Sequence, residues 1–110
     1  KVECVPVGKT CLDCEAMIDL DASPNTPGAK EIESEEYDDT GACRIWKLKC
    51  IGLLAGFELF AEGQRVGEVN APVDDPLEIV LELKCNADGT AWTFMDDPRP
   101  ITGVQCASVP

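Results

Sequence analysis

Apolar and polar side chains alternate along the second part of the chain, most clearly over Leu77–Cys85. Every odd-numbered residue of this stretch is apolar or cysteine, and glutamate and lysine fill most positions between. A period of two indicates a strand with one buried face, as in an antiparallel sheet. The turn-forming residues Asn86–Thr90 follow, with Gly89 free to adopt a positive φ, and Ala91–Phe94 then resumes the alternation. The pattern predicts a hairpin.

Further alternating stretches extend this picture. Arg44–Cys50 predicts a strand, and Phe57–Ala61 and Arg65–Val69 predict a second hairpin around a glycine-containing turn. We expect Asp97–Pro100 to turn the chain and Ile101–Cys106 to form the last strand.

The first part of the chain is less regular. Ala16–Leu20 fits a short first strand, and a helix over Cys11–Leu20 is the main alternative, because the apolar spacing fits both periods. Residues 22–41 contain two prolines and an acidic run, and we expect a long solvated loop within one domain spanning 1–110. The expected fold is an all-β antiparallel two-layer sandwich bridged by disulfides, with an immunoglobulin-like arrangement as one form of it. Trp46 and Trp92 lie on alternating faces, and we expect both in the core.

Charge and composition exclude several functions. The net charge of −12 argues against nucleic acid and anionic membranes as partners, because both would repel the chain. The absence of histidine removes imidazole as a general base or metal ligand. No nucleophile, phosphate-binding or dinucleotide motif is present, and no apolar run is long enough for membrane insertion. We expect no enzymatic activity and no cofactor.

Six carboxylates lie close together in the acidic run. Their density predicts a surface for a basic protein partner, since charge complementarity speeds association. Calcium is an alternative, although the spacing is not that of an EF-hand loop, and a solvated, self-repelling loop is another. The residues are Glu31, Glu33, Glu35, Glu36, Asp38 and Asp39.

Seven cysteines in 110 residues indicate an oxidising compartment, and we expect a secreted, extracellular protein. Cys11 and Cys14 form a C-x-x-C pair, for which redox and zinc roles are alternatives. A thioredoxin-like context and a second ligand pair are both missing from the sequence, so two structural cysteines bonded to different strands are the favoured interpretation.

Three segments together resemble the six-cysteine domain of nematode secreted and cell-surface proteins. They are Gly41–Cys43 with the strand ending in Cys50, then Leu83–Trp92, and finally Ile101–Cys106. The resemblance covers about Cys11 to Cys106, and Cys-Asn-x-Asp-Gly-x-x-Trp is its most specific part. It implies extracellular location and disulfide pairing, and no activity.

The six cysteines matching the resemblance are the disulfide candidates, and their connectivity stays open. They are Cys11, Cys14, Cys43, Cys50, Cys85 and Cys106. Cys4 lies outside the resemblance, which makes it the candidate for an unpaired thiol or for an interchain bond in a covalent homodimer.

These observations favour a secreted, non-enzymatic recognition module that binds a protein partner. Two alternatives remain. One is an extracellular-matrix or surface component cross-linked through Cys4. The other is a secreted protease inhibitor that inserts an exposed loop, Asp96–Pro100, into a protease cleft, with Arg99 as the residue on which inhibition depends.

Overall fold

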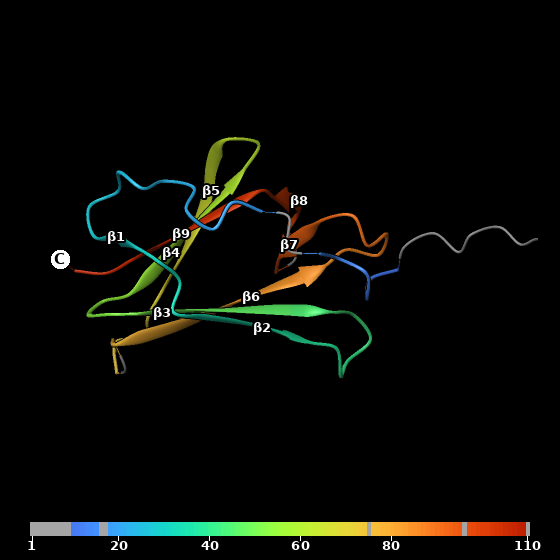
Figure 1. The fold of residues 1–110 in the computed structure, drawn as a ribbon, viewed down its shortest axis with the longest axis horizontal. Helices are drawn as coiled ribbons and strands as arrows, with labels where there is room; N and C mark the ends of the chain where they lie inside the picture. Colours follow the sequence, from blue (N-terminus) through green and yellow to red (C-terminus); the bar gives the residue numbers. More distant parts are fainter. Residues whose placement is uncertain (1–9, 16–17, 75, 96, 110) are drawn as a thin grey trace, which may run out of the picture.

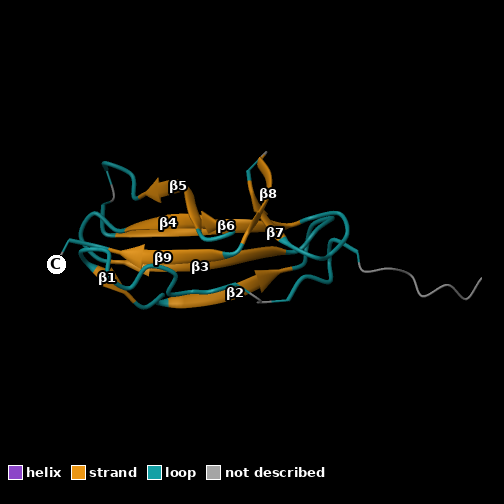
Figure 2. Ribbon diagram, turned by 90° about the horizontal axis from the view of Figure 1, so that it is seen from above, coloured by secondary structure: helices purple, strands orange, loops and turns teal. Residues whose placement is uncertain are grey.

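The protein folds into two antiparallel β-sheets that face each other, as Figures 1 and 2 show for this computed structural model. The structure describes residues 10–15, 18–74, 76–95 and 97–109. The first sheet has the strand order β1-β9-β4-β5 and the second β2-β3-β6-β7-β8. The expected all-β, antiparallel, two-layer architecture is confirmed. Within the described ranges no helix occurs that is long and apolar enough to cross a membrane.

The bounds of β3, β4, β5 and β6 follow the alternating pattern closely, whereas the expected last strand Ile101–Cys106 is divided, since Ile101 ends β8 and β9 begins at Gly103. The first sheet consists of β1 (Ala29–Lys30), β9 (Gly103–Ala107), β4 (Gly56–Ala61) and β5 (Gln64–Asn70). The second consists of β2 (Ser34–Asp38), β3 (Ile45–Ile51), β6 (Glu78–Cys85), β7 (Trp92–Phe94) and β8 (Asp97–Ile101). Both predicted hairpins, β4–β5 and β6–β7, are present.

The core fills the space between the two sheets. Trp46 and Leu48 of β3 lie opposite Leu83 and Leu81 of β6, and all four are at most 1% exposed. The facing sheet contributes an equally buried row of apolar side chains, Phe57, Leu59, Val104 and Cys106. Both tryptophans are core residues, as expected, with Trp92 1% exposed and its ring centroid 5.3 Å from that of Trp46.

One disulfide joins the two sheets inside this core. Cys50 of β3 is bonded to Cys106 of β9, both are 0% exposed, and their Cα atoms are 5.6 Å apart. The bond closes 56 residues of chain and fixes the distance between the layers.

Buried Gln105 holds the N-terminal segment against β9. Its Oε1 accepts a 2.8 Å bond from the Ser23 amide, and its Nε2 donates to the carbonyl of Cys106 at 3.0 Å and of Lys30 at 3.4 Å. The side chain is 0% exposed, so these bonds compensate the loss of solvation of its amide. The segment before β1 is thereby ordered on the outside of its sheet.

The expectation of a loop throughout 22–41 is wrong, because β1 and β2 lie within it. β2 is polar on both faces, which hides the period of two. It is a strand because β3 pairs with it along its whole length, from Ser34 opposite Lys49 to Asp38 opposite Ile45. Cross-strand pairing determines this element more than its own pattern does.

The turn expected at Asp97–Pro100 is also absent, because those residues belong to β8. β8 is an edge strand, where proline is tolerated because no further strand needs its N–H. In the predicted first element, Ala16 and Met17 lie outside the described residues. Asp19 forms only an isolated bridge to Gly103, so the described part of 11–20 is neither strand nor helix.

Replacing the core disulfide, Cys50→Ala with Cys106→Ala, should lower the free energy of unfolding by about 4 kcal/mol, because the unfolded chain regains the freedom of a long loop. Urea denaturation followed by circular dichroism measures the loss. The matched control is Cys11→Ala with Cys43→Ala, which opens a shorter loop of 32 residues at the surface. Loop entropy alone makes the control loss only about 0.5 kcal/mol smaller, so a control loss clearly larger than that of the core pair would contradict a dominant role for the buried bond.

Candidate recognition surfaces

The acidic residues lie along β2 and its flanks, at the open edge of the second sheet. Glu36 and Asp38 share the outer face with Lys47 and Lys49, whereas Glu35 shares the inner face with Trp46. Glu31 and Glu33 precede the strand and are exposed. The structure therefore places the six carboxylates in one strip but divides them between two faces.

Half of these carboxylates already have partners within the protein. Asp38 lies 3.3 Å from the Lys47 Nζ, and Asp39 accepts two bonds from the guanidinium of Arg44, at 2.8 and 3.0 Å. The Glu35 Oε1 accepts a 3.2 Å bond from the indole N–H of Trp46. Across the described ranges no three acidic or cysteine side chains converge in a metal-binding arrangement. Calcium binding remains only an expectation from the sequence.

Asp38 has the most strongly perturbed carboxyl of the strip. The hydroxyl of Thr40 donates to its Oδ1 at 2.5 Å and the Thr40 amide donates at 3.0 Å, and Lys47 adds a third favourable contact. These contacts lower the pKa of Asp38 from 3.8 to about 2. The carboxylate therefore stays ionised well into acid.

Arg44 links the acidic strip to the first disulfides. Its Nη1 donates to the carbonyl of Cys14 at 2.9 Å, and its guanidinium carbon lies 4.5 Å from the centre of the Tyr37 ring. Tyr37 stacks in turn on Trp92, with ring centroids 6.1 Å apart. The half-exposed tyrosine ring thus connects the guanidinium of Arg44 with the core tryptophans.

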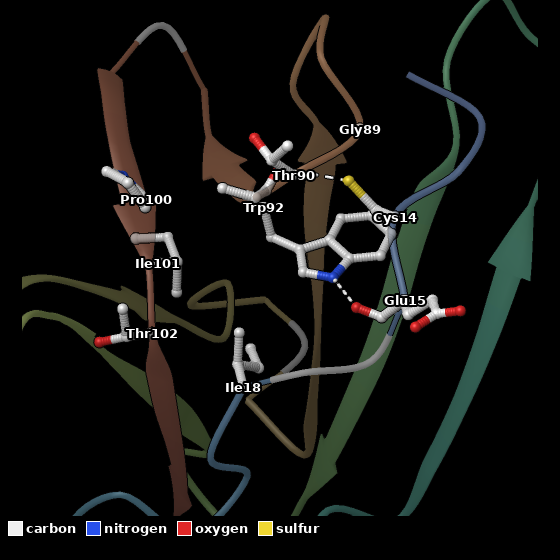
Figure 3. A pocket seen from close by; sticks show the side chains of 10 residues that line it. Cys14, Glu15, Ile18, Gly89, Thr90, Trp92, Pro100, Ile101 and Thr102 are labelled. Atoms are coloured by element: carbon white, nitrogen blue, oxygen red, sulfur yellow. Dashed lines mark hydrogen bonds between the residues drawn. The ribbon is translucent and has the colours of Figure 1, made fainter. Parts of the chain in front are cut away.

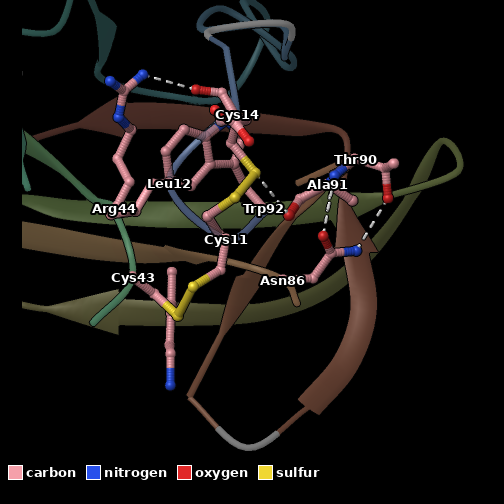
Figure 4. The surroundings of a disulfide bond; sticks show 12 residues. Cys11, Leu12, Cys14, Cys43, Arg44, Asn86, Thr90, Ala91 and Trp92 are labelled. Carbon is pink, nitrogen blue, oxygen red and sulfur yellow. Dashed lines mark hydrogen bonds between the residues drawn. A yellow bond between two sulfur atoms is a disulfide. The ribbon is translucent and has the colours of Figure 1, made fainter. Parts of the chain in front are cut away.

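The disulfide candidates pair as Cys11–Cys43, Cys14–Cys85 and Cys50–Cys106. The first two close one end of the sandwich, where Asn86 also bonds to Thr90 at 3.1 Å (Figure 4). The C-x-x-C sulfurs are bonded to different segments, which is the structural role favoured from the sequence. Cys4, the candidate for an interchain bond, lies outside the described residues.

A half-open cavity lies beside this closed end. Figure 3 shows the Trp92 indole donating to the Glu15 carbonyl, at 2.8 Å, with Ile18 and Ile101 on the cavity wall. Its volume is about 140 Å³, smaller than the pockets that enclose whole organic ligands. The cavity accommodates no more than a small apolar group.

Exposed apolar side chains gather at the opposite end, on the loops that follow β3, β5 and β9. We call this group the apolar apex. It lies where β3, β5 and β9 end and where the chain reaches its C-terminus (left in Figure 1). Its members and their exposed fractions are Leu53 51%, Leu54 61%, Val73 98%, Leu77 58% and Val109 46%.

Backbone hydrogen bonds hold the three loops of the apex together. The Leu54 amide donates to the Pro76 carbonyl at 2.7 Å, and the Val109 amide donates to the Leu53 carbonyl at 2.8 Å. Gly52 also donates to Leu77, at 2.9 Å. The apolar side chains therefore project from a connected framework.

A groove continues from the apex over the outer face of the first sheet. Its volume is about 410 Å³, and Leu54 and Val109 are among the residues that line it. Arg65 in the groove lies 3.0 Å from carboxylate oxygens of both Glu58 and Glu68. The groove is thus apolar toward the apex, and toward β5 it carries one arginine between two glutamates.

Sequence reasoning missed the apex, and assigned Leu77 to the buried face of its strand. The available signal was the adjacent Leu53 and Leu54 in a turn after Gly52, where turn chemistry favours glycine or asparagine. The proximity of these leucines to the loops that carry Val73 and Val109 depends on the fold.

The segment considered as an inhibitory loop is only partly described, since Asp96 lies outside the described residues. Arg99 stands in β8, and its guanidinium contacts Asp97 at 2.5 Å. This contact lowers the pKa of Asp97 to about 2. The guanidinium is engaged within its own strand, and the segment does not form the exposed loop that was expected.

Comparison with known proteins gives no relative: no family model, no curated protein and no solved structure matches this chain.

Replacing Thr40 with Val should raise the pKa of Asp38 above about 2, because the hydroxyl donor is lost. The value should stay below 3.8, since the Thr40 amide and Lys47 remain. Titration of the carboxyl carbon by NMR measures both proteins.

The lowered pKa also sets the direction of a stability change. The ionised Asp38 contributes its full share to the free energy of unfolding above the unfolded pKa of about 4, and this share is lost as the pH falls toward about 2. The share is smaller in the Thr40→Val variant. Lowering the pH from about 4 to about 2 should therefore destabilise the variant less than the parent. An unchanged Asp38 titration in the variant would show that the hydroxyl bond does not hold the carboxylate.

Proposed function

We propose that the chain is a secreted, non-enzymatic recognition module that binds a protein partner through its apolar apex. The observation that carries this proposal is the concentration of exposed Leu and Val side chains on three loops at one end of the sandwich. Exposed apolar side chains concentrated on neighbouring loops are characteristic of interaction sites, because leaving them in water is unfavourable.

The framework beneath the apex supports binding with little ordering cost. Leu53 and Leu54 sit in a turn closed by a 3.1 Å bond from the Ala55 amide to the Gly52 carbonyl. Further backbone bonds tie that turn to the neighbouring loops. A surface that is ordered before binding loses less conformational entropy when the partner arrives.

The backbone of Leu54 is strained in a way that its exposed side chain explains. Its φ is +56°, in the left-handed region, where a residue with a Cβ costs about 1–2 kcal/mol. Glycine or asparagine would relieve that cost, and the leucine is 61% exposed, so core packing does not require it. Contact with a partner supplies a reason for leucine at this position.

The acidic strip has a complementary role in this proposal. Glu31, Glu33 and Glu36 are exposed on a chain of net charge −12, and they favour approach of a partner with basic surface. This electrostatic attraction raises the association rate, whereas the apolar apex supplies the contact from which water is excluded.

Secretion is supported by the three internal disulfides, which persist in an oxidising compartment.

The proposal is tested by screening the full chain against an array of purified extracellular domains. We expect saturable binding to at least one domain. The double variant Leu53→Ser with Leu54→Ser should weaken that binding by about tenfold or more, since it removes the central apolar contacts. Higher salt should slow association through the acidic strip.

Met95→Ser is the matched control, because Met95 is 76% exposed and also has a positive φ, but lies in the β7–β8 turn away from the apex. It should leave the affinity unchanged. Undiminished binding by a correctly folded apex variant would overturn the assignment of the site. The absence of any saturable partner in the array would count against protein recognition itself.

A further inference from the structure

The two sheets have four edges, and three of them carry features that block a further strand. β1 has only two residues, and β8 contains Pro98 and Pro100, which lack the N–H that a paired strand needs. β2 carries Glu35, Glu36 and Asp38, which would repel the same strand of a second copy. Short length, proline and charge are the usual protections of sheet edges.

β5 is the fourth edge and differs from the other three. It spans seven residues without proline, pairs only with β4 among the described strands, and leaves most of its residues exposed. Its one basic and one acidic residue, Arg65 and Glu68, cancel in charge. A bulge lies opposite the step from Leu59 to Phe60, and the pairing from Gly67 to Asn70 beyond it is regular.

The charges of β5 are arranged to suit an identical strand. Arg65 lies opposite Phe60 and Glu68 lies opposite Glu58, and because of the bulge both side chains project to the same outer face, where they meet at 3.0 Å. When two copies of β5 run antiparallel in the register that sets residue 65 opposite residue 68, the Arg65 of each copy lies on the same face as the Glu68 of the other. This neutral edge avoids the repulsion expected elsewhere between two chains of net charge −12.

We propose that β5 pairs antiparallel with β5 of a second copy, joining the two first sheets into one continuous sheet across a two-fold axis. Such an isologous contact closes on itself, because each edge is used once. Backbone hydrogen bonds hold the two strands together, and the reciprocal Arg65 and Glu68 contacts favour the antiparallel arrangement.

This arrangement places the two apices at opposite ends of the dimer. β5 runs toward the apex, which it reaches at Asn70, and the Ala71 amide then bonds to the Ala55 carbonyl at 2.9 Å. In an antiparallel pair the two strands reach their apices in opposite directions. The dimer therefore presents two binding ends that can engage two partners, although dimer formation does not depend on the proposed function of the apex.

The test is the concentration dependence of mass, measured by light scattering and sedimentation on the full chain carrying Cys4→Ser, which removes any interchain bond through Cys4. The parent should reach twice the chain mass as concentration rises. Arg65→Glu and Glu68→Arg should each weaken dimerisation about tenfold or more, since each places like charges across the seam. An equimolar mixture of the two variants should restore the dimer, because their opposite charges then meet.

Lys84→Glu and Asp88→Arg are the matched controls, because they make the same changes in net charge at exposed positions outside β5. They should dimerise like the parent. The rescue by mixing separates a loss of contact from a loss of folding, since misfolded variants would not recover. A parent that stays monomeric at every concentration, or a dimer unaffected by both β5 variants, would overturn the proposal.

Discussion

The buried bond between Cys50 and Cys106 is the constraint on which the rest of the structure depends. It joins β3 and β9, and each of these strands has a paired strand on either side within its own sheet. Because these two strands are held together, the two sheets are held at a fixed distance. The buried side chains around Trp46 in one sheet and Phe57 in the other pack between them. A chain of 110 residues buries a modest core, so a covalent link between its layers carries more weight than it would in a larger domain.

The two ends of the sandwich are stabilised in different ways, and this difference shapes the functional interpretation. One end is closed covalently by Cys11–Cys43 and Cys14–Cys85 and by the contacts of Arg44. The other is held by backbone hydrogen bonds between loops, which leave the side chains free to face outward. Stabilising a loop cluster through its backbone makes the side chains available for contact with another molecule.

Much of the fold followed from the sequence because most strands have one apolar and one polar face. That signal located β3, the β4–β5 hairpin and β6 nearly to the residue. It failed for β2, whose side chains are polar on both faces and whose pairing depends on β3. It failed for β8, where two prolines indicate a turn but are equally compatible with an edge strand.

The candidate sites were less accessible to sequence reasoning than the fold. The acidic strip is visible as a run of carboxylates, but its division between two faces follows from the pairing of β2 with β3. The apex could not be recognised from the sequence as one surface, because the loops after β3, β5 and β9 are far apart in the chain and are joined by backbone hydrogen bonds only after the strands are paired. Local patterns describe elements well, whereas surfaces built from several loops require the register of the whole sheet.

The three disulfides also determine the covalent connectivity of the chain as a whole. Their loops run from 11 to 43, from 14 to 85 and from 50 to 106, and together they overlap without a gap. Every peptide bond between Cys11 and Cys106 therefore lies inside at least one closed ring. A protease that cuts once anywhere in this interval leaves a single covalent molecule, and the break becomes visible as separate fragments only after reduction. One cut therefore need not release any part of the fold.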